Sequence, residues 1–173
     1  MTDNVQENAR TRIALVTGGS RGLGRSTALN LAERGVDVIL TYQSNRADAD
    51  SAVAEIEQLG QRAAALQLEV GDIGSFAGFV DEVKAVLAGW GADRFDYLVN
   101  NAGHNARGVL GEITEADFDG LVNVHFKGVL FLTQALLPLL RDGGSIVNVS
   151  SGLARFVHTG SCLLYTSPSP RDS

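Results

Sequence analysis

Thr17-Gly18-Gly19-Ser20-Arg21-Gly22-Leu23-Gly24 is the stretch that decides the fold. It follows an apolar run at 13–16 and precedes a segment at 25–34 that has a helical pattern. A glycine-rich turn between a buried strand and a helix brings backbone N–H groups and the positive end of the helix close to a phosphate. The sequence therefore predicts a phosphate-binding turn.

Three kinds of turn fit this stretch: a dinucleotide loop, a nucleoside-triphosphate loop, and a tight strand-to-helix turn without a ligand. Residues 19–26 match the triphosphate pattern G-x-x-x-x-G-K-S/T except that Arg25 replaces the lysine. That lysine is a compact charge that reaches the terminal phosphates, and arginine is not equivalent to it. We favour the dinucleotide loop.

The composition limits the class of protein. A chain of 173 residues with 45% hydrophobic residues is sufficient for one packed domain. The net charge of −6, without a basic cluster, argues against a nucleic-acid or anionic-membrane partner. Residues 1–12 are polar and the most apolar stretch, 129–140, is too short for a membrane span, so we expect a cytoplasmic protein. The single cysteine, Cys162, gives no basis for a disulfide within the chain or a cysteine metal cluster, and no metal is expected.

Short apolar strands alternate with helical stretches from residue 12 onward, which is typical of a parallel sheet covered on both faces. We therefore predict a doubly wound α/β fold of the Rossmann type. Its parallel sheet is expected to be incomplete and to contain only the first five strands. The domain is expected at 12–161, after a disordered segment at 1–11. The predicted strands are 12–17, 36–42, 62–69, 95–100 and 144–150, and the predicted helices are 22–34, 47–59, 75–88, 114–118 and 119–140.

The carboxyl ends of these strands carry the polar residues that a ligand would meet. After the second strand, residues 42–46 contain no acid to hold a free ribose hydroxyl, so a 2′-phosphate is easier to place there. Arg21 and Arg46 are candidates to pair with it, which favours NADP over NAD. Glu69 and Val70 follow the third strand and are candidates to contact adenine, and 100–103 supplies small residues where a cofactor passes.

These motifs together resemble the short-chain dehydrogenase/reductase family over residues 10–161. The cofactor loop T-G-x-x-x-G-x-G is matched at 17–24, and N-N-A-G is matched at 100–103. The resemblance implies an oxidoreductase that moves a hydride between a nicotinamide and a carbonyl or alcohol carbon. A non-catalytic dinucleotide sensor or scaffold remains the alternative. The implied cofactor-binding residues are Gly18, Ser20, Arg21, Gly22, Leu23, Gly24, Ser44, Asn45, Arg46, Glu69, Val70, Asn101, Ala102 and Gly103.

Relatives in this family use a serine, a tyrosine, a lysine and an asparagine for catalysis. Ser151 falls at the serine position, after the fifth predicted strand. In the family's N-x-x-G pattern, counting back from Gly128 places His125 at the asparagine position, and Asn123 lies two residues earlier. The resemblance therefore implies Ser151 and His125 as catalytic candidates.

The end of the chain departs from the family. The tyrosine usually follows the serine by thirteen positions, which is Leu164; Tyr165 comes one position later, and no lysine follows it. Residues 162–172 resemble the in-frame translation of a sequencing-library adapter, so we expect the gene sequence to stop near residue 161 and do not assign Tyr165 a catalytic role. The remaining fragment is expected to lack turnover.

The expected partners are a small carbonyl or alcohol substrate and further copies of the chain. The loop at 104–111 offers His104, Asn105 and Arg107 as polar candidates near the substrate. The resemblance implies a homodimer or homotetramer formed through the helix at 119–140, and the strand at 144–150 is expected to be an apolar edge.

Overall fold

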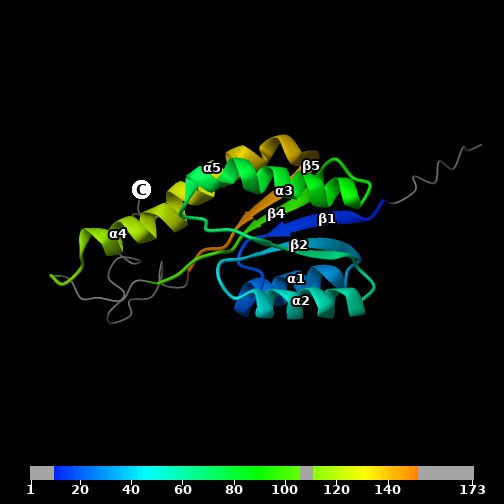
Figure 1. Ribbon diagram of the computed structural model, residues 1–173, viewed down its shortest axis with the longest axis horizontal. Coiled ribbons are helices and arrows are strands. Elements are labelled where there is room, and N and C mark those ends of the chain that lie inside the picture. Colours follow the sequence, from blue (N-terminus) through cyan, green and yellow to red (C-terminus); the bar gives the residue numbers. More distant parts are fainter. Residues whose placement is uncertain (1–9, 106–110, 152–173) are drawn as a thin grey trace, which may run out of the picture.

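A five-stranded parallel sheet forms the centre of the protein (Figure 1). The computed structural model describes residues 10–105 and 111–151. The strand order is β3-β2-β1-β4-β5, with every neighbouring pair parallel. The predicted doubly wound α/β fold is confirmed. The strands are β1 (Arg12–Val16), β2 (Val36–Tyr42), β3 (Ala63–Gln67), β4 (Phe95–Asn100) and β5 (Leu140–Asn148).

Helices cover both faces of the sheet, with α1 and α2 on one side and α3 and α5 on the other (Figure 1). All seven residues of β2 are buried, which explains its nearly continuous apolar sequence. One apolar cluster joins β1, β2 and β4 to α1 and α2, and a second joins the opposite face to α3 and α5. The helices are α1 (Gly22–Ala32), α2 (Arg46–Gln58), α3 (Phe76–Gly89), α4 (Glu115–Val122) and α5 (Val129–Leu136).

The prediction of separate helices at 114–118 and 119–140 is wrong, because one helical run extends from Glu115 to Leu139. Its start is fixed by a capping box: the Thr114 hydroxyl accepts from the Asp117 N–H at 3.2 Å, and the Asp117 carboxylate accepts from the Thr114 N–H at 3.0 Å. The Thr114 hydroxyl also donates to this carboxylate at 2.6 Å, and the hydrogen bonds from the hydroxyl and from the Thr114 N–H lower the pKa of Asp117. The run continues through a π-helical turn, η2 (Asn123–Gly128), and closes in a 3-10 turn, η3 (Leu137–Leu139), that contains the proline.

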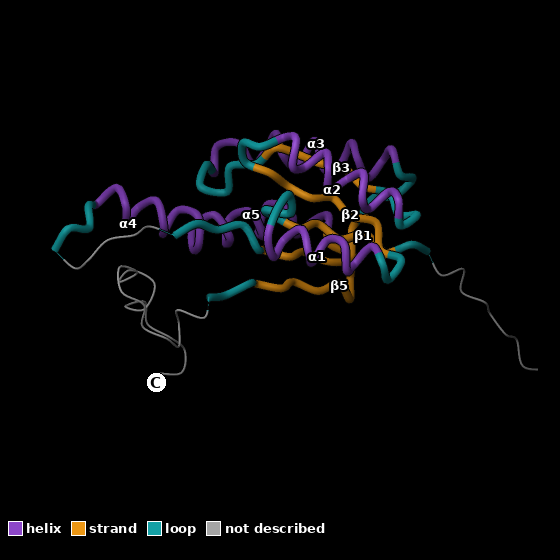
Figure 2. Tube along the Cα trace, turned by 90° about the horizontal axis from the view of Figure 1, so that it is seen from below, coloured by secondary structure: helices purple, strands orange, loops and turns teal. Residues whose placement is uncertain are grey.

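This helical run exposes much of its apolar surface. Its first turns, in α4, extend beyond the sheet in two perpendicular views (Figures 1 and 2). By length and composition alone the run is able to cross a membrane, with 22% of its most apolar window buried, although core helices of soluble proteins pass the same test. Its exposed large apolar side chains are Phe118, Phe126, Leu130, Phe131 and Leu137.

Strand β5 begins earlier than the predicted strand at 144–150, and it includes both Gly143 and Gly144. Its pairing with β4 shifts register between Phe95 and Tyr97, so the two glycines lie at a local irregularity of the strand. Ile146 is 40% exposed and Val147 is 51% exposed, consistent with an apolar edge among the described residues. The remaining elements agree with the prediction to within two residues at either end.

A buried carboxylate fastens the chain at the opposite end of the sheet from the glycine turn. Asp96 accepts hydrogen bonds from the Arg10 guanidinium at 3.1 and 2.5 Å and from the Ile13 N–H at 2.9 Å. Burial alone raises the pKa of Asp96, but the hydrogen bonds from Arg10 and Ile13 and the charges of Arg10 and Arg141 outweigh it. The pKa of Asp96 is therefore lower than that of an ordinary aspartate.

Candidate functional site

The glycine-rich turn packs directly against the first turn of α1. A Cβ atom at Gly24 would lie 2.2 Å from the Gly18 carbonyl oxygen and 2.4 Å from Asn101 Nδ2, so only glycine fits there. The first turn of α1 contains no acidic residue, which leaves the positive end of the helix uncompensated. This geometry suits an anion such as a phosphate.

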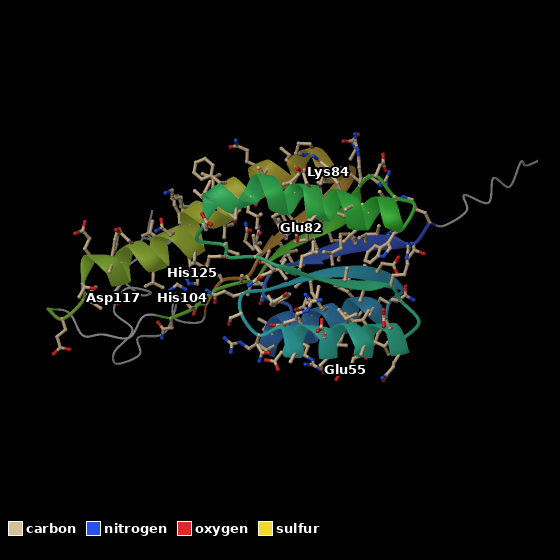
Figure 3. All side chains as sticks on the ribbon, viewed as in Figure 1. Glu55, Glu82, Lys84, His104, Asp117 and His125 are labelled. Carbon is tan, nitrogen blue, oxygen red and sulfur yellow. The ribbon has the colours of Figure 1, made fainter. Side chains whose placement is uncertain are left out.

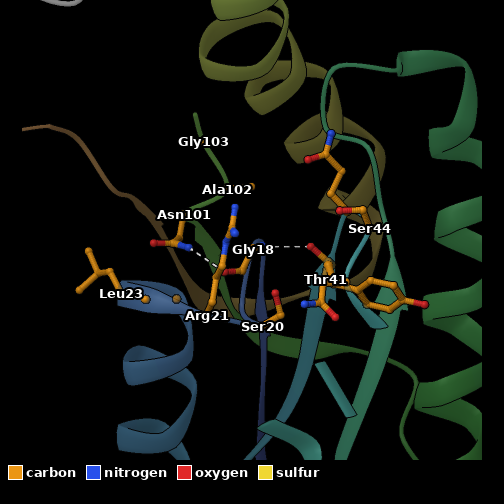
Figure 4. Close-up of a pocket in the computed structure, with 14 residues that line it drawn as sticks. Gly18, Ser20, Arg21, Leu23, Thr41, Ser44, Asn101, Ala102 and Gly103 are labelled. Carbon is orange, nitrogen blue, oxygen red and sulfur yellow. Dashed lines mark hydrogen bonds between the residues drawn. The ribbon is translucent and has the colours of Figure 1, made fainter. Parts of the chain in front are cut away.

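The two sequence motifs bind each other at the carboxyl ends of β1 and β4. Thr17 Oγ1 accepts the backbone N–H groups of Asn101 and Ala102, both at 3.0 Å. Asn101 Nδ2 donates to the Thr17 carbonyl at 2.9 Å and to the Gly18 carbonyl at 3.3 Å. The segment after β4 is thereby held against the glycine turn (Figure 4).

A cavity of about 320 Å³ lies above this junction (Figure 4). That volume is at the small end of the range for ligand pockets. Residues from the glycine turn, the end of β2 and the segment after β4 form its walls. They are Gly18, Ser20, Arg21, Gly22, Leu23, Gly24, Thr41, Tyr42, Gln43, Ser44, Asn45, Asn101, Ala102 and Gly103.

Sequence reasoning did not select Thr41, Tyr42 and Gln43, although they end the second strand. Thr41 has a direct part in shaping the turn, because its Oγ1 accepts from the Gly18 N–H at 3.1 Å and its carbonyl accepts from the Gly19 N–H at 2.9 Å. The sequence feature that could have identified these three residues is their position at the carboxyl end of the strand next to β1, where a parallel sheet binds its ligands.

The other three residues implied by the resemblance lie away from this cavity. Arg46 starts α2, its side chain is 74% exposed, and its guanidinium lies 3.4 Å from the Asp50 carboxylate. Glu69 accepts from the Gln43 amide and from the Gly71 N–H, and it lines a neighbouring cavity of about 490 Å³. Val70 is buried.

Arg25, the residue at the lysine position of the triphosphate pattern, also points elsewhere. Its guanidinium donates to the Glu55 carboxylate at 2.7 Å and to the Ser51 hydroxyl at 2.9 Å. Arg21 is therefore the arginine that lines the cavity in the described part of the chain.

The two catalytic candidates lie on segments next to the cavity walls. Ser151 follows β5, whose end is fixed to β4 by the bond from the Val149 N–H to the Asn100 carbonyl at 2.9 Å. His125 lies on η2, with Nε2 2.6 Å from the His104 carbonyl oxygen (Figure 3). Three residues considered from the sequence, Arg107, Leu164 and Tyr165, fall outside the described residues.

Comparison with known proteins identifies a matching family model and several relatives. The family model described as short chain dehydrogenase matches residues 12–167. The short chain dehydrogenase/reductase AacuN of Aspergillus aculeatus is 35% identical over 143 residues, 83% of this chain and 52% of that protein. The 3-oxoacyl-(acyl-carrier-protein) reductase FabG of Staphylococcus aureus is 39% identical over 147 residues, 82% of this chain and 56% of that protein.

Solved structures agree with the sequence relatives. The landomycin C-6 ketoreductase LanV, with bound NADP and rabelomycin, has a TM-score of 0.85 and 36% identity, covering 90% of this chain and 64% of that one. A short chain dehydrogenase from Burkholderia cenocepacia in complex with NADP has a TM-score of 0.79 and 40% identity, covering 88% and 60%. The chain thus spans about half the length of the curated relatives, and by its family model, its relatives and its fold it belongs to the short-chain dehydrogenase/reductase family.

Proposed function

We propose that the protein is an NADP-preferring oxidoreductase that interconverts a ketone and a secondary alcohol or reduces a similar carbonyl. The observation that carries this proposal is the cavity built by the glycine turn and the Asn101 segment, with Arg21 on its wall. When bound, the nicotinamide cofactor donates or accepts the hydride. The protein supplies its binding and orientation, and holds the substrate oxygen.

The preference for NADP rests on the charges around the cavity. None of the described residues that line it is an aspartate or glutamate, so no carboxylate is placed there to hold a free 2′-hydroxyl. Arg21 offers a planar fork of donors that suits a 2′-phosphate. Ser44 and Asn45 add polar groups at the end of β2. The bound NADP of LanV and of the Burkholderia protein supports the same cofactor for this chain.

Two residues are proposed for the chemistry. Ser151 would hold the substrate oxygen, and His125 would take the place of the family's asparagine, where an imidazole is able to donate or accept a hydrogen bond. The family's tyrosine and lysine have no counterpart at matching positions in this sequence. We therefore propose that the 173-residue chain binds the cofactor but has negligible turnover, because no group at these positions would supply the proton.

Assembly and location complete the proposal. Five large apolar side chains lie exposed on the run from Glu115 to Leu139, a face that another copy of the chain would cover in a homodimer or homotetramer. We place this assembly in the cytoplasm.

A titration of the 173-residue chain with NADPH, NADH and ATP tests the cofactor. We expect the tightest binding for NADPH, weaker binding for NADH, and none for ATP, because Arg25 is held by Glu55 and Ser51. Tight ATP binding without NADPH binding would contradict the proposal. Oxidation of NADPH by this chain with any ketone, above background, would contradict the proposed loss of turnover.

A further inference from the structure

Two histidines pack against glycines across the junction between the segment after β4 and the long helical run. A Cβ atom at Gly103 would lie 2.5 Å from His125 Cε1, so this glycine leaves the space that the imidazole occupies. On the other side, His104 Nε2 lies 3.8 Å from the position of a Cβ at Gly120, an ordinary contact. The two rings lie 5.6 Å apart between centroids, and Figure 3 shows them together where η2 meets this segment.

His125 also bonds to the backbone of that segment. Its Nε2 lies 2.6 Å from the His104 carbonyl oxygen and 3.2 Å from the His104 backbone nitrogen. One ring nitrogen cannot both carry a hydrogen and accept one, and the shorter contact is the one to the carbonyl. The geometry thus favours a hydrogen on Nε2 that donates to the His104 carbonyl.

The segment after β4 is therefore held at both of its ends. At one end Asn101 is bonded to Thr17 and Gly18. At the other end the His104 carbonyl is bonded to His125. Between these two anchors lie Ala102 and Gly103, which form one wall of the cavity.

We propose that His125 is a positioning residue for the cofactor, because it fixes the Ala102–Gly103 wall through Gly103 and His104. This inference rests on the proposed function of the cavity, and it adds to the catalytic role proposed for His125 a task that needs no turnover. The wall at Ala102–Gly103 and the residues Ser44 and Asn45 lie on opposite sides of the glycine turn, because β2 and β4 flank β1. We therefore expect His125 to affect the nicotinamide half of the cofactor and not the half that carries the 2′-phosphate.

Calorimetric titration of the 173-residue chain with NADPH and with 2′,5′-ADP tests this local role. Loss of one hydrogen bond in His125→Ala is expected to weaken NADPH binding about three- to ten-fold. Binding of 2′,5′-ADP, which lacks the nicotinamide half, should stay the same. Lys127→Gln is the matched control, because Lys127 lies on the same π-helical turn with an exposed side chain, and it should bind NADPH normally. Equal weakening of both ligands, or no change in either, overturns the proposal.

A double-mutant cycle tests the contact itself. Gly103→Ala should weaken NADPH binding when His125 is present, since its Cβ would displace the ring. In His125→Ala the space is open, so the double variant should bind NADPH no more weakly than His125→Ala alone. Additive losses contradict the proposed contact. If His125→Ala does not fold, His125→Gln takes its place, and its side-chain amide should restore part of the donor to the His104 carbonyl.

A measurement without ligand separates this inference from the proposed function. Long-range proton–nitrogen NMR spectra of the imidazole ring of His125 should show the hydrogen on Nε2 when the ring is neutral. A hydrogen on Nδ1 overturns the proposal even if NADPH binds. If the chain binds neither NADPH nor 2′,5′-ADP, the proposed function fails, and the role of His125 toward the cofactor fails with it. The NMR spectrum still reports whether His125 Nε2 donates to the His104 carbonyl.

Discussion

Substitution of Gly24 by alanine tests the packing of α1 against the glycine turn. The new Cβ would lie 2.2 Å from the Gly18 carbonyl oxygen and 2.4 Å from Asn101 Nδ2. Comfortable contacts begin at about 3.5 Å, so the helix and the turn must separate by about 1 Å. Both groups are already hydrogen-bonded to each other, which limits how far either one is able to move alone.

The cost of this separation follows from measured effects of overpacking, which are typically about 1–3 kcal/mol. We take the upper end because two fixed groups are displaced. Alanine also favours a helix over glycine by about 1 kcal/mol, which offsets part of the loss. The net loss in free energy of unfolding is about 2 kcal/mol, equivalent to a fall of about 4–8 °C in Tm for a chain of this size.

Thermal unfolding followed by circular dichroism measures this change, with Gly78→Ala as the matched control. Gly78 lies in α3, and a Cβ there would meet nothing within 4 Å, so the same substitution should stabilise the protein by about 0.5–1 kcal/mol. NADPH binding should fall in Gly24→Ala and stay unchanged in Gly78→Ala. A Gly24→Ala protein that melts at or above the unaltered chain would refute the reasoning.

Three further predictions concern charge and assembly. Because the pKa of Asp96 is lowered, the stabilising effect of its carboxylate is complete above the unfolded pKa of about 3.9 and disappears as the pH falls through the folded pKa. Urea unfolding at a series of pH values should show this loss of stability, and Asp96→Asn should abolish this pH dependence. Arg21→Ala should weaken NADPH binding about 10- to 100-fold and leave NADH binding nearly unchanged in parallel titrations. Leu130→Glu should shift the chain toward monomer in analytical ultracentrifugation, and an unchanged oligomer would exclude this face as the interface.

The sequence was most informative where structure depends on near neighbours and on the order of strands. Glycine spacing at 17–24 predicted the turn and the start of α1, since backbone conformation there is decided locally. The meeting of Asn101 with Thr17 followed from the parallel sheet, because the ends of β1 and β4 share one edge. Eleven of the fourteen residues implied for the cofactor line one cavity, and their roles toward a cofactor stay predictions.

Other features depend on competition between partners that spacing does not reveal. Arg46 pairs with Asp50 one helical turn later on α2 and does not line the cavity, so its proposed role stays a prediction. No sequence pattern predicted the π-helical turn at Asn123–Gly128, since a single wide turn depends on how the helix packs rather than on residue preference. The roles of Ser151 and His125 also stay predictions.

The central position of β1 has a consequence for the order in which the protein folds. Arg12 pairs with Val36 after a short connection, whereas Ala14 pairs with Tyr97 across roughly three times as much chain. Closing the longer loop costs roughly 1 kcal/mol more in chain entropy, and β4 also leaves the ribosome later. Two nearly adjacent amides report the two events, because the Gly19 N–H bonds to Thr41 and the Thr17 N–H bonds to Val99. Pulse-labelled hydrogen exchange during refolding should therefore show the Gly19 amide protected before the Thr17 amide. By the same reasoning, the glycine turn of the nascent chain forms its contacts with β2 first and its contacts with the Asn101 segment last.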